Sequence, residues 1–200
     1  MTEPIIYVVD DDEAMRDSMT WLLEGEGYQV ACFESAEAFL RARNDAMRGC
    51  LVLDVRMPEM SGLELHEKLD TLGSRLPIIF ITGHGDVPMA VAALQRGACD
   101  FIEKPFHNED LLSRVSRALE LDNQLATRQK QTSAIAHRLA QLTQREREVM
   151  QLVVAGKLNK QVADQLDISM KTVEAHRARV MEKMGVRTLA ELVKAVMSVS

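Results

Sequence analysis

The stretch Ile5-Ile6-Tyr7-Val8-Val9-Asp10-Asp11 decides the fold of the first 120 residues. Its five consecutive apolar residues, most of them β-branched, predict a strand that is buried on both faces. Four similar runs follow, at Tyr28–Phe33, Leu51–Leu53, Pro77–Ile81 and Phe101–Glu103. The segments between them carry apolar residues at helical spacing. This alternation predicts an α/β domain with a parallel five-stranded sheet.

Several of these runs end in a residue that can take part in chemistry. Asp10 and Asp11 follow the first run, and Asp54, Thr82 and Lys104 follow the third, fourth and fifth. Because functional groups gather at the carboxyl edge of a parallel sheet, we expect these side chains to converge. An oxygen-rich cluster of this kind suits Mg²⁺. Asp54 is the best nucleophile for accepting a phosphoryl group, and Lys104 would neutralise the growing charge.

Each of these residues also has a simpler interpretation when it is taken alone. Acidic residues at Asp10 to Glu13 would favour a helix N-terminus, and we accept that interpretation for Asp12 and Glu13. Lys104 before Pro105 would be a surface turn, and Thr82 a common strand residue. Only the joint placement at strand ends predicts a site. The loop after Thr82, Gly83-His84-Gly85-Asp86, has two glycines, which suit a conformational switch.

The net charge of −6 conceals two halves of opposite sign. Residues 1–120 carry 11 Lys and Arg against 22 Asp and Glu, a net charge of −11, and residues 121–200 carry 13 against 8, a net charge of +5. This split predicts two domains, the second attracted to a polyanion. We place them at 1–120 and 139–200, joined by a helical linker at 121–138. A short packing helix fits the linker better than a coiled coil, and whether it holds the domains docked or apart stays open.

Composition limits the location of the protein. The apolar runs are about as long as strands, too short to cross a bilayer, so we expect no membrane association. Cys32, Cys50 and Cys99 match no metal-ligand spacing, and we expect them to be reduced core residues. The chain enters a strand without the pattern of a signal peptide, so we expect a cytoplasmic protein.

The C-terminal part has the pattern of four helices, at about 144–155, 160–166, 170–184 and 189–198. Thr143 and Thr188 begin capping-box patterns, and Asn159 and Ser169 suit N-cap positions. Only Asp167-Ile168-Ser169 separates the second helix from the third, which is the short turn of a helix-turn-helix.

The 170–184 helix is the predicted recognition helix. Its free face can enter a DNA major groove, where Glu174 would accept a hydrogen bond from cytosine and Ala175 or Ala178 would contact a thymine methyl. Flanking cations would hold phosphates. The candidate DNA contacts are Lys160, Lys171, Thr172, Glu174, Ala175, Arg177, Ala178, Arg179 and Lys183.

Together the strand-end motifs resemble the signature of two-component receiver domains over about residues 4–120. They are Val9-Asp10-Asp11, Leu53-Asp54-Val55-Arg56-Met57-Pro58 with Gly62, Ile81-Thr82-Gly83 and Lys104-Pro105-Phe106. The resemblance implies a flavodoxin-like fold with strand order 2-1-3-4-5 and phosphorylation of Asp54 by a sensor histidine kinase. It implies Mg²⁺ ligands at Asp10, Asp11, Asp54 and the backbone carbonyl of Arg56, phosphate pairing by Lys104, and a cis Lys104–Pro105 bond. Phe101 stands where many receivers carry a switch tyrosine.

The C-terminal motifs resemble the LuxR-type DNA-binding domain. They are Leu142–Val149, Asn159–Ala163, Leu166–Ser169, Thr172-Val173, His176 and Lys183–Val186. The whole chain resembles NarL/FixJ-type response regulators, and Gly83–Met89 points to the FixJ branch. The resemblance implies a transcriptional regulator that is not a conventional enzyme, dimerises through a face around residues 87–119 when phosphorylated, and binds double-stranded promoter DNA.

Two alternatives stay open. An aspartyl-phosphate hydrolase would need a second acid/base carboxylate near Asp54, where Val55 and Arg56 stand instead. A regulator that works without phosphorylation would leave the acidic site idle.

Overall fold

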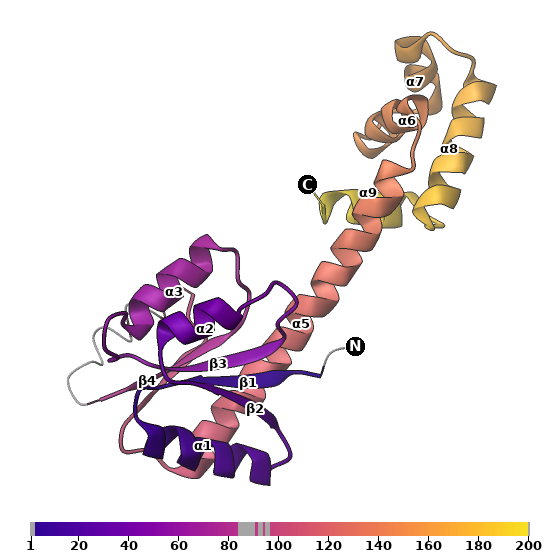
Figure 1. Ribbon diagram of the computed structural model, residues 1–200. Coiled ribbons are helices and arrows are strands. Elements are labelled where there is room, and N and C mark those ends of the chain that lie inside the picture. Colours follow the sequence, from indigo (N-terminus) through magenta and orange to yellow (C-terminus); the bar gives the residue numbers. More distant parts are fainter. Residues whose placement is uncertain (1–2, 84–90, 92–93, 95–96, 200) are drawn as a thin grey trace. The chain divides into compact units, whose positions relative to one another are not determined.

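The computed structural model describes residues 3–83, 91, 94 and 97–199, and the chain divides into two compact units, Met1–Ala126 and Thr127–Ser200 (Figure 1). None of the helices in the described part of the chain is long and apolar enough to cross a membrane. Of the three cysteines, Cys50 is buried and Cys99 partly buried, but Cys32 is exposed, so its predicted core position is wrong.

The first unit contains a parallel five-stranded sheet. Its strands are β1 (Ile5–Val9), β2 (Gln29–Phe33), β3 (Gly49–Asp54), β4 (Ile78–Thr82) and β5 (Asp100–Glu103). They lie in the order β2-β1-β3-β4-β5, which confirms the predicted topology. The described helices of this unit are α1 (Glu13–Gly25), α2 (Ala36–Ala42), α3 (Gly62–Thr71) and the beginning of α5 (Asn108–Ala140).

Apolar residues cover both faces of this sheet, as expected for parallel strands. On one face, Tyr7, Leu53 and Phe80 pack with Phe39 of α2 and Leu65 of α3. On the other face, strand residues pack with α1 and α5 (Figure 1). Alternate residues of each strand therefore serve opposite cores, and the strands are apolar almost throughout.

Gly49 lies close against the backbone of β1. Its φ is +124°, and a Cβ atom built there would lie 1.8 Å from the carbonyl oxygen of Ile5. Only glycine fits the start of β3 beside β1.

Helix α5 runs without a break from Asn108 to Ala140, so the predicted linker residues 121–138 are helical. In the first unit, the helix is held by an ion pair between Arg48 and Asp122. Asp122 is 5 % exposed, and Arg48 Nη2 lies 2.8 Å from its Oδ2. Arg48 Nε donates to both carboxylate oxygens in a bifurcated hydrogen bond.

The second unit contains α6 (Gln144–Val154), α7 (Asn159–Leu166), α8 (Met170–Met184) and α9 (Leu189–Met197). Val149, Val162, Val173, Val180 and Leu192 form part of its core. The C-terminal end of α5 also belongs to it, because its side chains pack on the same cluster. The predicted helical domain is confirmed.

The predicted helix caps are confirmed only in part. The Thr143 capping box and the Ser169 cap form. At α9, the Thr188 hydroxyl accepts from Glu191 N, but the Glu191 carboxylate accepts from Arg187 N, so only half of that box forms. The predicted cap at Asn159 is wrong, because α7 begins at this residue and Leu158 occupies the N-cap position.

Candidate functional site

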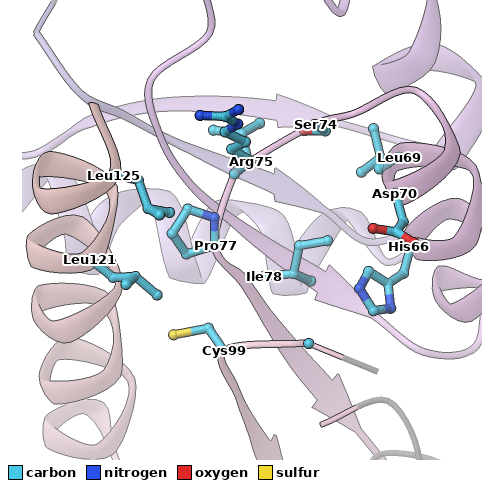
Figure 2. Close-up of a pocket in the computed structure, with 12 residues that line it drawn as sticks. His66, Leu69, Asp70, Ser74, Arg75, Pro77, Ile78, Cys99, Leu121 and Leu125 are labelled. Carbon is cyan, nitrogen blue, oxygen red and sulfur yellow. The ribbon is translucent and has the colours of Figure 1, made fainter. Parts of the chain in front are cut away.

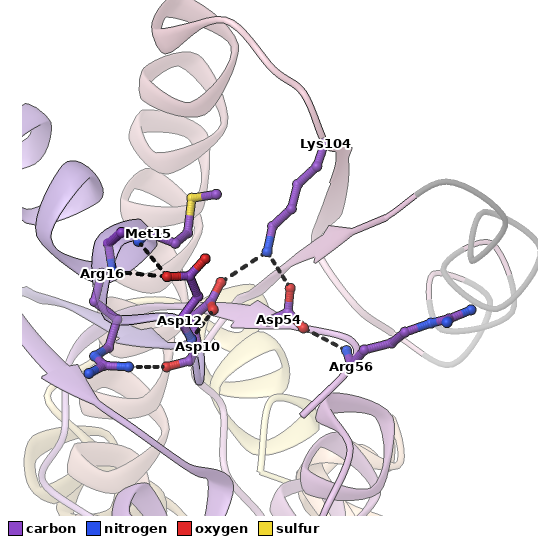
Figure 3. Close-up of polar contacts among 8 residues, drawn as sticks. Asp10, Asp12, Met15, Arg16, Asp54, Arg56 and Lys104 are labelled. Atoms are coloured by element: carbon purple, nitrogen blue, oxygen red, sulfur yellow. Dashed lines mark hydrogen bonds and ion pairs between the residues drawn. The ribbon is translucent and has the colours of Figure 1, made fainter. Parts of the chain in front are cut away.

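Three of the predicted strand-end side chains meet at the carboxyl edge of the sheet. Val9 pairs with Leu53 across β1 and β3, so the next residues, Asp10 and Asp54, leave the sheet side by side. The ammonium of Lys104 lies between them, with Nζ 2.6 Å from Asp54 Oδ1 and 3.1 Å from Asp10 Oδ2 (Figure 3). The predicted convergence of these three residues is therefore observed.

Backbone hydrogen bonds fix both carboxylates. Asp10 Oδ1 accepts from Asp12 N at 2.9 Å, and Asp54 Oδ2 accepts from Arg56 N at 2.7 Å (Figure 3). Asp10 and Asp54 are 1 % and 5 % exposed. Gly62 contributes by being small, because a Cβ atom there would lie 2.2 Å from the carbonyl oxygen of Asp54. The start of α3 can therefore lie directly against the backbone of Asp54.

Burial and charge oppose each other at this site. Burial raises the pKa of Asp54, although the hydrogen bond and positive charge of Lys104 act in the other direction and the charge of Asp10 adds to the increase. Burial lowers the pKa of Lys104, but the hydrogen bonds and charges of Asp54 and Asp10 outweigh it, so its pKa is raised. The 2.6 Å contact between Lys104 Nζ and Asp54 Oδ1 has the geometry of a charge-assisted hydrogen bond.

The remaining predicted residues of this site lie in different settings. Thr82 is fully buried and its hydroxyl donates to Gly83 O at 3.1 Å. Phe101 is partly buried and packs against the core on the α2 and α3 face. Asp12 is the N-cap of α1, which confirms its interpretation as a capping residue. The Lys104–Pro105 bond is cis, as the resemblance implied.

Asp11 does not join the other two carboxylates. It is exposed, and within residues 3–83, 91, 94 and 97–199 no group of three His, Cys, Asp or Glu side chains could hold a metal ion. The expected three-carboxylate cluster is therefore not present as such.

The donor set nevertheless fits Mg²⁺. The two buried carboxylates of Asp10 and Asp54 both contact the Lys104 ammonium, which occupies a position that a metal cation could share. Mg²⁺ is usually bound through one or two carboxylates and keeps several waters. Asp10 and Asp54 supply such a pair.

Two cavities of the first unit differ in their relation to this site. A mainly apolar groove of about 520 Å³ reaches Lys104 and Gly83, with Met15, Met19 and Phe106 in its walls. A second pocket, of about 240 Å³, lies where β4 and β5 begin (Figure 2). Its wall includes Leu121 and Leu125 of α5 but none of the predicted site residues.

The surface of α8 is the second candidate region. Val173, Val180 and Met184 are buried in the unit, so the opposite side of the helix faces solvent. The exposed residues on that side are Lys171, Glu174, Ala175, Ala178, Arg179 and Glu182. Lys160 at the start of α7 is also exposed. This is the face that the sequence predicted to be free.

Three predicted DNA contacts have partners within the unit. Lys183 Nζ lies 2.6 Å from Glu146 Oε2, and Glu146 is 2 % exposed. Arg177 donates to the side chain of Asn159, and the Thr172 hydroxyl shares a hydrogen bond with Ser169. These bonds give the three side chains a structural role, and their contact with DNA stays a prediction. Sequence analysis missed Glu146 as a buried ion-pair partner, because it saw this residue only as part of a capping box.

Comparisons with known proteins agree with both regions. The model of the response regulator receiver domain matches residues 6–116, and that of the bacterial regulatory proteins of the luxR family matches residues 140–196. The response regulator protein TmoT of Ectopseudomonas mendocina is 48 % identical over 96 % of this chain and 87 % of its own length. The transcriptional regulatory protein FixJ of Bradyrhizobium diazoefficiens is 45 % identical over 98 % and 96 %.

A solved structure of the response regulator StyR is similar with a TM-score of 0.86 and 41 % identity, over 98 % of this chain and 99 % of that one. The strand order, the two matched domains and these relatives lead to one conclusion. The chain belongs to the two-component response regulators, as a transcriptional regulator with a receiver domain and a LuxR-type DNA-binding domain.

Proposed function

We propose that Asp54 accepts a phosphoryl group from the phosphohistidine of a sensor histidine kinase. The observation that carries this proposal is the position of Lys104, whose Nζ contacts both Asp54 and Asp10. A carboxylate oxygen of Asp54 attacks phosphorus, the phosphorus–nitrogen bond breaks, and the imidazole leaves with the bonding electrons. The product on this chain is an acyl phosphate.

Lys104 serves this reaction in two ways. Its hydrogen bond and positive charge oppose the rise in the pKa of Asp54 that burial causes, which favours the carboxylate form that would act as nucleophile. After transfer, the same ammonium would pair with a phosphoryl oxygen and leave the carboxylates. Asp10, Asp11, Asp54 and the backbone carbonyl of Arg56 would hold Mg²⁺. When it is bound, Mg²⁺ neutralises negative charge on the phosphoryl oxygens.

The switch would act through Thr82, Lys104 and Phe101. The Thr82 hydroxyl now donates to Gly83 O and would exchange this partner for a phosphoryl oxygen. Such exchange would shift the receiver toward a conformation with different phosphate contacts, which is the source of free energy that a switch needs. Residues 84–90, which include most of the predicted switch loop, lie outside the described residues. The same holds for residues 87–90, 92–93 and 95–96 of the expected dimerisation face at 87–119. Homodimerisation therefore remains our proposal from the family.

DNA binding would use the exposed face of α8. Glu174 would accept from a cytosine amine, and Ala175 and Ala178 would contact thymine methyls. Phosphate contacts would come from the exposed cations Lys160, Lys171 and Arg179. With three phosphate contacts, a plot of log K for DNA binding against log salt concentration should have a slope of about −2.7 for each bound unit. If Arg177 and Lys183 also contacted phosphates, five contacts would give a slope of about −4.5.

The proposed domain limits are 1–120, 121–138 and 139–200. They are supported by the family matches at 6–116 and 140–196, and by the helical backbone between them.

The phosphoacceptor is tested with acetyl phosphate and Mg²⁺, and the product is measured on a phosphate-affinity gel. The Asp54→Asn variant should not be labelled. Asp70→Asn, which changes an exposed carboxylate on α3, should be labelled like the wild type. Labelling of Asp54→Asn at the wild-type level would show that another residue is the acceptor.

Promoter recognition is tested by enrichment of random duplexes with phosphorylated and unphosphorylated protein. Phosphorylated protein should enrich a symmetric or repeated sequence. Glu174→Ala should relax selection at one base pair, at a cost of about 1–3 kcal/mol, whereas Lys160→Ala should weaken binding to all duplexes alike. Equal enrichment with and without phosphorylation would favour a regulator that does not depend on it.

A further inference from the structure

The C-terminal end of α8 is bonded to the last turns of α5 within the second unit. Arg138 Nη1 of α5 donates to Met184 O at 2.9 Å, and Met184 is the last residue of α8. The final carbonyl groups of a helix have no partner inside the helix, so this bond satisfies one of them with a cation at the negative end of the helix dipole.

Gly185 leaves the space that this contact needs. It is the C-cap of α8 with φ +66°, and a Cβ atom built there would lie 3.1 Å from Arg138 Nη1. The guanidinium therefore packs directly over the glycine where α8 ends. The left-handed conformation and the room for Arg138 both favour glycine at this position.

A second bond connects the same two segments in the opposite direction. Lys183 of α8 donates to Gln141 O at 3.3 Å, just beyond the end of α5, while the buried carboxylate of Glu146 holds its ammonium. Ile135 and Leu139 of α5 pack on the core that contains Val180 and Met184. The C-terminal end of α5 thus packs against α8 and forms hydrogen bonds with its last turn.

These contacts act at the C-terminal end of α8, away from the residues proposed to contact bases. A helix-turn-helix contacts base edges mainly with the N-terminal residues of its recognition helix. Arg138 binds the opposite end, about 20 Å along a helix of 15 residues. A small tilt at this end changes where Glu174 and Ala178 lie.

We propose that Arg138 is a positioning residue for sequence-specific DNA binding, acting through α8 and making no DNA contact of its own. This inference rests on the proposed use of α8 in DNA recognition. It assigns a role in specificity to the end of the linker helix, outside the helix-turn-helix.

The test uses the full-length phosphorylated protein and two duplexes, one enriched by the wild type from a random library and one with that sequence scrambled. Arg138→Ala should lose roughly tenfold in affinity for the enriched duplex, the equivalent of one charge-assisted hydrogen bond. Its affinity for the scrambled duplex and its salt dependence should match the wild type. Arg138→Lys, which keeps one donor and the charge, should recover most of the loss. Arg128→Ala is the matched control, because it removes the same charge from an exposed position of α5.

Several outcomes would overturn the proposal. Equal losses on both duplexes, with a salt slope reduced by about 1, would make Arg138 a phosphate contact. If Arg138→Ala lowers the thermal midpoint of unfolding but leaves the ratio of the affinities for the two duplexes unchanged well below that midpoint, the role of Arg138 is purely structural. If Arg138→Ala does not fold, Arg138→Lys decides, because positioning requires a measurable loss on the enriched duplex alone. A wild type that enriches no sequence would refute the proposed function itself, and this inference with it.

Discussion

Replacing Glu146 by Gln removes the charge from a carboxylate that is almost fully buried, while keeping an oxygen that can accept from Thr143 N in the capping box. The hydrogen bond from Lys183, followed by that from Thr143 N, lowers the pKa of Glu146 from 4.5 to about 2. This difference sets a ceiling of about 3 kcal/mol on the stabilisation at neutral pH. The Lys183 side chain is 33 % exposed, so solvent screening reduces the expected loss to about 1.5–2 kcal/mol.

The sign of the pH dependence follows from the lowered pKa. The folded state holds the Glu146 carboxylate in its charged form more strongly than the unfolded state does. The stabilisation is therefore fully present above pH 4.5 and is lost as the pH falls toward about 2. The difference in unfolding free energy between wild type and Glu146→Gln should be constant from pH 6 to 7 and should shrink between pH 4.5 and 2.

Urea unfolding followed by far-ultraviolet circular dichroism measures this difference. Hydrogen exchange at the amides of α6 distinguishes unfolding of the second unit from that of the first. Glu148→Gln, on the same helix, is the control, because its partner Arg145 is exposed and a surface ion pair contributes little to stability. The reasoning fails if Glu146→Gln costs no more than this control at pH 7, or if its effect does not shrink in acid.

Three further perturbations follow from the first unit. Gly49→Ala should prevent the receiver from folding, because its Cβ would overlap Ile5 O, and the amides of β1 and β3 would then exchange hydrogen without protection. Arg48→Met should destabilise the first unit by about 2–3 kcal/mol, because it leaves Asp122 buried without its cation. Hydrogen exchange should then become faster in α5 around Asp122. The double change Arg48→Met with Asp122→Leu should regain most of this stability, and no recovery would argue against the ion pair. Removal of Mg²⁺ with EDTA should abolish labelling by acetyl phosphate. Lys104→Met should be labelled more slowly than the wild type, because Asp54 loses the charge that favours its carboxylate form, and it should no longer enrich DNA, as gels and sequencing of the bound duplexes would show.

Much of the receiver fold was predictable because its signals are local. Each buried strand is a short apolar run, and each helix between strands has its own spacing. The parallel topology then brings the strand ends to one edge, so Asp10, Asp54 and Lys104 could be placed together without any alignment. The geometry of the sheet therefore accounts for most of the predicted site.

Asp11 shows what this reasoning does not give. Asp10 is buried and its carboxylate accepts from Lys104, whereas the adjacent Asp11 is exposed. The type of a residue and its place after a strand therefore do not give its burial. The part of Asp11 in holding Mg²⁺ stays a prediction.

The cap of α7 depends on a partner far away in sequence. Asparagine is a favoured N-cap residue, but the side chain of Asn159 accepts a hydrogen bond from Arg177 on another helix. The backbone N–H of Leu158 is satisfied by Gln161 instead. Asparagine does favour the N-cap position, but here the side chain of Asn159 is engaged by Arg177, and Leu158 occupies that position.

The cations of the second unit follow the same logic. Their number gives the positive charge of residues 121–200, but exposure and pairing decide which of them a DNA phosphate can reach. Lys183 is bound by a carboxylate 37 residues earlier, and Arg177 by an amide 18 residues earlier, neither of which a local pattern identifies. Both bonds hold α8 in place. In the proposed DNA complex these residues would fix the helix that carries Glu174, and the exposed cations would provide the attraction.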